Sequence, residues 1–153
     1  MSTRPTLLLP LLFAIACAGP GYRVPAPPAG WQRLGAEGDS FAYHNAGGGT
    51  MAANVTCDSG EDVPLDVLTN HLLFGIEQRQ ERARTPITVD GRGALRTRID
   101  GRLDGVPVAL ELVVLKKDGC VYDLFLIAPP GALTAHQPAF DRFLAGFAQV
   151  AKR

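Results

Sequence analysis

The sequence predicts an α+β fold in which an antiparallel β-sheet of about six to seven strands is sandwiched between helices. Runs rich in β-branched and aromatic residues are separated by Gly and Asp-Gly turn signals, with no crossover helix between the later runs. Two of these runs are apolar on both faces, and two other segments carry apolar residues at helical spacing. A sheet whose central strands are covered on both sides accounts for these observations.

The first part of the domain is expected to form three short antiparallel strands, at residues 31–34, 40–45 and 50–57. Gly47-Gly48-Gly49 lies between the second and third of them. Glycine tolerates the positive φ that a tight turn needs, so this triplet predicts a hairpin.

A helix is predicted after these strands, with Asp62 as its capping residue and Pro64 in its first turn. Apolar residues follow at helical spacing, so we expect the helix to continue to about Gln80: Leu65, Leu68, Leu72 and Ile76. Gly75 would lie beside this apolar stripe and let the helix approach the sheet closely.

The middle of the chain is expected to be an antiparallel meander with strands at 86–90, 94–100, 106–116 and 120–128. Four dipeptides give the turn signals: Asp90-Gly91, Asp100-Gly101, Asp104-Gly105 and Asp118-Gly119.

The two later strands of this meander, 106–116 and 120–128, are apolar on both faces and therefore predicted to be central. A C-terminal helix after Pro138 is expected to supply the second cover. Its apolar stripe consists of Phe140, Phe143, Leu144, Phe147 and Val150.

The N-terminal segment resembles the signal sequence of a bacterial lipoprotein. Arg4 precedes an apolar run of about ten residues, shorter than the roughly 20 that a spanning helix requires, and the run ends in Ala14-Ile15-Ala16-Cys17. The resemblance implies that residues 1–16 are a cleaved signal peptide and that the sulfur of Cys17 carries a lipid. The alternative is an ordinary secretory signal that leaves Cys17 as a free thiol.

Residues 17–30 are expected to be a tether, too rich in Pro and Gly to pack, that spans roughly 40 Å in polyproline geometry. Residues 31–153 then form a single domain. Ala18 stands where an Asp would retain a lipoprotein at the inner membrane, so the resemblance implies the periplasmic face of the outer membrane.

Cysteine usage fits such a location, and the charge balance gives no sign of a particular partner. Fifteen basic and fifteen acidic residues give a formal net charge of zero, which predicts no nucleic-acid partner. With Cys17 assigned to lipid, Cys57 and Cys120 are expected to form a disulfide in an oxidising compartment. Two buried thiols, or one redox-active cysteine, are the alternatives.

Motifs for catalysis or cofactor binding are missing from the sequence. Gly38-Asp39-Ser40 is similar to the nucleophile block of one hydrolase class, but the Asp-x-x-His that this class needs is absent. The three histidines are far apart, and no metal-ligand spacing occurs. The sequence therefore predicts a protein that is not an enzyme, without cofactor or metal.

One basic group is a candidate binding patch: Arg92, Arg96, Arg98 and Arg102 have the same parity and should lie on one side of their strand. Guanidinium groups suit phosphate and carboxylate, so we hypothesise contact with lipid head groups or an acidic partner. The alternative is a solvated face with ion pairs to Glu81, Asp90 and Asp100.

The order of elements resembles the PsbP photosystem proteins, the Ran-binding Mog proteins and small bacterial lipoproteins of the same α/β/α fold. The resemblance depends on core and turn residues: Trp31, Phe41-Ala42-Tyr43, Pro64-Leu65, Ala128-Pro129-Pro130, Phe140, Phe143 and Phe147. Because members of this superfamily mostly bind or assist other proteins, the resemblance implies that the chain is a non-enzymatic accessory or scaffold subunit of an envelope complex. A periplasmic module that binds a lipid or small ligand is the second reading, and a hydrolase the third.

Overall fold

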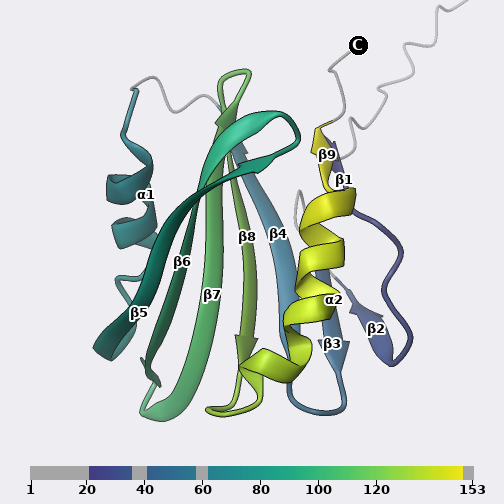
Figure 1. The fold of residues 1–153 in the computed structure, drawn as a ribbon, viewed down its shortest axis with the longest axis vertical. Helices are drawn as coiled ribbons and strands as arrows, with labels where there is room; N and C mark the ends of the chain where they lie inside the picture. The colour runs from purple at the N-terminus through teal and green to yellow at the C-terminus, as the bar shows by residue number, and fades with distance from the viewer. Residues whose placement is uncertain (1–20, 36–40, 58–61, 150–153) are drawn as a thin grey trace, which may run out of the picture.

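The structure is a computed structural model that describes residues 21–35, 41–57 and 62–149. Seven strands form one antiparallel sheet in the order β2-β3-β4-β8-β7-β6-β5. Helices α1 and α2 pack on opposite faces of this sheet (Figure 1). The predicted α+β sandwich is confirmed. The elements of the main sheet and its covers are β2 (Trp31–Leu34), β3 (Phe41–Asn45), β4 (Thr50–Cys57), α1 (Leu65–Leu72), β5 (Ile76–Val89), β6 (Arg92–Leu103), β7 (Val106–Lys117), β8 (Cys120–Ala128) and α2 (Leu133–Gly146).

The central strands β7 and β8 have a different apolar core on each face. On one face Leu112 and Val114 pack with Leu73 and α1. On the other face Val113 and Leu115 join the aromatic side chains under α2. Each strand therefore buries both of its faces, as its composition predicted.

Three of the four Asp-Gly turn signals are hairpin turns. Both residues of each have positive φ, about 47–50° for the Asp and 71–79° for the Gly, at positions 90–91, 104–105 and 118–119. This is the pattern of a type I′ turn, whose twist matches that of antiparallel strands. The fourth prediction, a turn at Asp100-Gly101, is wrong.

Gly101 lies inside β6 because β5 approaches it too closely for a side chain. A Cβ atom at this position would lie 2.5 Å from the side chain of Ile76 and 2.9 Å from the carbonyl oxygen of Glu77. β5 is bulged at this point, between Glu77 and Gln80. The glycine thus accommodates the bulge and does not form a turn.

Helix α1 is shorter than predicted, and its predicted cap is wrong. The helix ends at Leu72, and Ile76 begins β5 opposite Leu103. Every residue from 77 to 82 is polar, so pairing with β6 is available to a segment that offers a helix no apolar stripe. Gly75 lies in the intervening turn, where an added Cβ would meet nothing within 4 Å.

Asp62 does not cap the helix. Its carboxylate accepts a hydrogen bond from Lys116 on β7, and the N-cap position is Pro64, which makes no side-chain cap bond. Lys116 lowers the pKa of Asp62 through this hydrogen bond and its positive charge.

Helix α2 begins at Leu133, before Pro138 and not after it. The first turns run at an angle to the rest of the helix (Figure 1), as expected when a proline removes a hydrogen bond in the interior. Phe140, Phe143 and Leu144 are buried as predicted, and Phe147 is buried in extended backbone just after the helix. Val150 and Gly38-Asp39-Ser40 lie outside the described residues.

Residues 21–30, here called the strap, pack on the domain. Within the strap β1 (Tyr22–Arg23) pairs with β9 (Ala148–Gln149) in a separate two-stranded sheet. Tyr22 is only 2% exposed and donates a hydrogen bond from its hydroxyl to the carbonyl oxygen of Ala53 at 2.9 Å. Further along, Pro25 accepts a hydrogen bond from the hydroxyl of Tyr43 at 3.0 Å. The expectation that this stretch is too rich in Pro and Gly to pack is wrong for the strap.

The predicted disulfide is confirmed. Cys57 and Cys120 are joined across β4 and β8, where they lie directly opposite each other in the register. The bond closes a loop with a sequence separation of 63, which on the chain-entropy model stabilises the fold by roughly 4 kcal/mol.

The packing of the strap gives a testable prediction. Tyr22 contacts the rings of Phe41, Tyr122 and Phe147 at centroid distances of 5.6–6.1 Å. We expect Tyr22→Ala to lower the free energy of unfolding by about 3–5 kcal/mol, as for other buried aromatic truncations. Urea denaturation of the Cys17→Ala chain measures this change. Arg23→Ala is the matched control, because Arg23 is exposed on the same strand, and equal effects of the two substitutions would contradict the packing of the strap.

Candidate binding surface beside helix α2

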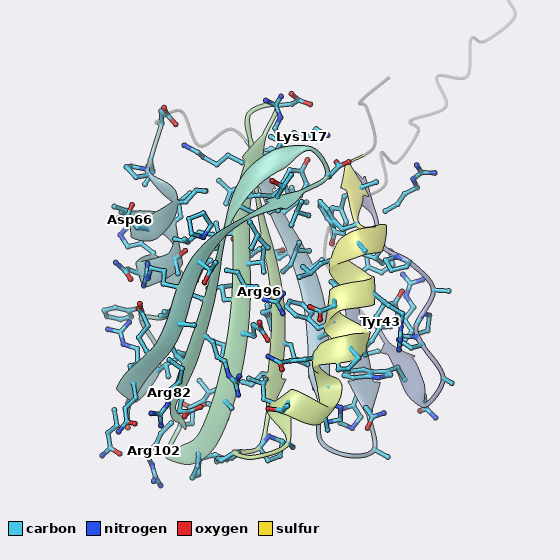
Figure 2. All side chains as sticks on the ribbon, viewed as in Figure 1. Tyr43, Asp66, Arg82, Arg96, Arg102 and Lys117 are labelled. Carbon is cyan, nitrogen blue, oxygen red and sulfur yellow. A yellow bond between two sulfur atoms is a disulfide. The ribbon has the colours of Figure 1, made fainter. Side chains whose placement is uncertain are left out.

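The four arginines of the predicted patch lie along β6 but do not form one site. Arg96 and Arg98 project to the face covered by α2, where they contact its side chains. Arg92 is the first residue of β6 and pairs with Asp118 at 3.5 Å. Arg102 donates to the carbonyl oxygen of Gly105 in the β6–β7 turn, and Figure 2 shows it at the far end of the sheet from Lys117.

Arg96 is held by two carboxylates. Its Nε donates to the carboxylate of Glu111, which is 3% exposed, and Nη2 donates to Oδ1 of Asp141 at 2.8 Å. Gln137 of α2 donates to the second oxygen of Glu111 at 3.1 Å. This network joins β6, β7 and α2, so its first role is to fix the helix to the sheet.

Arg98 has fewer partners in the described part of the chain. It donates to Oγ1 of Thr134 at 3.4 Å, near the upper limit for a hydrogen bond, and its buried Nε has no hydrogen-bond partner there. A guanidinium with unused donors is suited to bind an oxyanion. Arg98 is therefore the member of the row that best fits the anion hypothesis, whereas Arg96 already binds two acids.

The acids that were expected to neutralise these arginines form ion pairs with other cations. Asp100 accepts from Arg82 at 2.6 Å, Glu81 from Arg84 at 2.8 Å, and Asp90 from Lys117 at 2.8 Å. The Arg82–Asp100 pair depends on the register of β5 against β6, and the Lys117–Asp90 pair depends on the turns at the strand ends. Glu81 and Arg84 lie three residues apart on β5 itself.

A hollow of about 450 Å³ opens beside the network, between the β5–β6 hairpin and α2. Its lining mixes apolar and charged side chains, among them Ile87, Val89, Arg96, Asp141 and Leu144. Its volume falls within the range of small-molecule sites.

Sequence reasoning missed Glu111 and Asp123, two buried acids in the otherwise apolar central strands. The signal was present, since each carboxylate interrupts an apolar run. Buried acids are uncommon unless paired, so such an interruption indicates either an ion pair or a perturbed pKa. Glu111 has the ion pair, and Asp123 has the perturbed pKa.

Asp123 lies on the α1 face of β8, opposite Asn54 and Val114 in the register. It is 7% exposed, and its buried Oδ1 has no hydrogen-bond partner in the described residues. Desolvation disfavours the ionised form and raises the pKa of Asp123 to about 6.

This pKa gives a prediction for stability against pH. The folded state holds the Asp123 proton more tightly than the unfolded state, whose Asp pKa is 3.8. The free energy of unfolding should therefore fall as pH rises from about 4 to above 6, by on the order of 3 kcal/mol. We expect Asp123→Asn to remove this fall in urea titrations between pH 4 and 7.5. Profiles with the same pH dependence in both proteins would contradict it.

The Arg96 network gives a second prediction. Removing one partner of a buried ion pair leaves the other charge unpaired, so Arg96→Met should cost about 3 kcal/mol of unfolding free energy. Adding Glu111→Gln to this variant should restore part of the loss, because the unpaired charge is then removed. Denaturant midpoints of the four proteins in the cycle measure the coupling. Arg82→Met is the control, since its pair with Asp100 is half-exposed and should contribute under about 1 kcal/mol; a similar loss there would contradict the prediction.

In 21–35, 41–57 and 62–149 no group of three or more His, Cys, Asp or Glu side chains is placed to hold a metal ion. Over the same ranges no helix has the length and apolar character needed to cross a bilayer.

The strand order, with one helix on each face, defines an α+β fold that is similar to the fold of PsbP and Mog proteins. By sequence it matches no family model and no characterised protein. Several solved structures have a similar fold, among them the three proteins described next. The Ran-binding protein Mog1p of Saccharomyces cerevisiae has a TM-score of 0.62 and 11% identity over 85% of this chain and 90% of its own.

The other two structures are similar at the same level. LpqN of Mycobacterium tuberculosis, described as involved in cell envelope biogenesis, has a TM-score of 0.61 and 15% identity over 85% of this chain and 83% of its own. The cyanobacterial PsbP of Synechocystis, CyanoP, has a TM-score of 0.57 and 11% identity over 91% of this chain and 98% of its own. At these identities the likeness concerns the fold.

Proposed function

We propose that this chain is a lipid-anchored, non-enzymatic accessory protein of the bacterial cell envelope. In this proposal the sulfur of Cys17 carries the lipid, the domain faces the periplasm from the outer membrane, and one surface of the domain binds an envelope protein. The lipoprotein-like segment that ends at Cys17 supplies the reason for the anchor.

The observation that carries the location is the Cys57–Cys120 disulfide. Such bonds form and persist in oxidising compartments, including the periplasm, and are rare where thiols are kept reduced. A disulfide between two strands of the sheet thus supports a protein that folds after export.

The similar structures support the accessory role. LpqN is described as involved in cell envelope biogenesis, and Mog1p as Ran-binding. The first description concerns the same cellular structure, and the second a binding activity. Together with the lack of a catalytic motif, they favour a protein that acts by binding another protein.

The second candidate, a module that encloses a small ligand beneath α2, has less support. The side chains of Tyr22, Tyr122, Phe140 and Phe143 are each 2% exposed or less and fill the space under the helix. Ring pairs such as Tyr43 with Phe143, at 6.1 Å, indicate close packing there. A small ligand would therefore have to bind at the surface, in the hollow beside Arg96 or near Arg98.

The anchor is tested by fractionation and by mass. We expect the full chain in the membrane fraction, with a mature N-terminus at Cys17 that carries the added mass of acyl chains. Cys17→Ala should be released from the membrane, whereas the double variant Cys57→Ala/Cys120→Ala should remain attached. An unmodified N-terminus on a protein that is washed off the membrane would contradict the proposal.

The accessory role is tested by crosslinking in cells, again with Cys17→Ala as the control. Recovery of a defined envelope complex that depends on the anchor supports the role. Recovery of a small molecule or lipid alone would favour the second candidate.

A further inference from the structure

Four exposed apolar side chains gather at one end of the sheet. Leu72 ends α1 and Phe74 lies in the α1–β5 turn, while Leu103 ends β6 and Val106 begins β7. Their exposed fractions are 91% for Phe74, 60% for Val106, 44% for Leu72 and 37% for Leu103. The register brings these segments together, because Leu103 is the strand partner of both Ile76 and Val106. We call these four residues the apolar tip.

Single exposed apolar residues are common, but a gathering of them marks an interaction site. Phe74 is the strongest case, since an aromatic side chain that is almost wholly in water gains nothing from the fold. It stands in a short turn held by bonds from the amides of Phe74 and Ile76 to the carbonyl oxygens of His71 and Leu73. The turn thus presents Phe74 on a fixed backbone, as an anchor residue requires.

The rim of the apolar tip carries both signs of charge. Glu77 and Arg102 are strand partners next to the tip; Arg79 lies two residues after Glu77, and Asp104 lies two residues after Arg102. Two acids and two bases give this rim no net charge. An apolar centre with a mixed polar rim is the composition of a protein interface. A surface that binds anionic lipid would instead be rich in Lys and Arg.

The strap gives a second, independent reason for a protein partner. The chain enters the fold at Tyr22, which packs against Tyr122 at the end of the sheet opposite the apolar tip (Figure 1). From Val106 to Leu115, the strand partner of Tyr122, β7 spans roughly 30 Å. The five peptide units from Cys17 to Tyr22 reach at most about 18 Å. An anchor on Cys17 thus holds the Tyr22 end nearest the bilayer and directs the apolar tip away from it.

We propose that the apolar tip is the docking surface of this protein for another envelope protein, one that offers an apolar pocket for Phe74 inside a rim of mixed charge. This inference rests on the proposed anchoring at Cys17 for its orientation. In the docked complex, Leu72, Leu103 and Val106 add to the area that is buried around Phe74. The charges of Glu77 and Arg102 then orient the partner on the tip.

The test uses a photocrosslinking amino acid at position 74 or 106 of the full chain in cells. The matched control is position 34, because Leu34 is an exposed apolar residue, 42% exposed, on edge strand β2 away from the tip. We expect positions 74 and 106 to give an adduct with the same envelope protein and position 34 to give none. With that protein purified, Phe74→Ser should weaken binding about tenfold or more, and Leu34→Ser should leave it unchanged.

Other outcomes overturn the proposal. Adducts with lipid alone would assign the tip to the membrane, an adduct of twice the chain mass would assign it to a second copy, and no adduct would remove the docking role. The mass of the mature N-terminus is measured in the same samples. An unmodified Cys17 would refute the anchoring while leaving an adduct at position 74 informative, whereas a lipidated chain without that adduct refutes the docking alone.

Discussion

The structure depends on the burial of β7 and β8 on both faces. Leu112 and Val114 need cover on one side, and Val113 and Leu115 need cover on the other, so the sheet must lie between two layers. The chain supplies α1 for the first face. For the second face it supplies α2 together with Tyr22 of the strap. Tyr22 is thereby part of the core, so the chain joins the domain at this end of the sheet.

Tyr22 lies at one end of the sheet, and the apolar tip lies at the other end. At the Tyr22 end, Lys116 and Lys117 pair with Asp62 and Asp90, so these two lysines are already neutralised. At the other end Phe74 is exposed, and nothing in the described residues covers it. Polar pairing at one end and apolar exposure at the other suit a domain that is attached at the first and binds a protein at the second.

Much of the fold could be predicted from the sequence. The apolar runs at 106–116 and 120–128 predicted the central strands, and three Asp-Gly turns and the Cys57–Cys120 bond follow from local chemistry and from cysteine count. The α1–β5 boundary was missed because Ile76 continues the spacing of Leu65, Leu68 and Leu72, although it contributes to the same core from a strand. The burial of Tyr22 was missed because the surrounding segment is rich in Pro and Gly, a composition that predicts no packing. The acids that hold Arg96 lie 15 and 45 residues away along the chain, and the register of β6 against β7 and the packing of α2 bring them together.

The orientation of the domain on the membrane is the central claim, and energy transfer to acceptor lipids tests it most directly. Lipidated protein in vesicles is labelled at the β7–β8 turn through Asp118→Cys, or at the β6–β7 turn through Asp104→Cys. These turns have the same conformation and lie at opposite ends of β7, roughly 40 Å apart. We expect strong transfer from position 118 and weak transfer from position 104. Equal transfer, or stronger transfer from position 104, would contradict a domain that presents its apolar tip away from the bilayer.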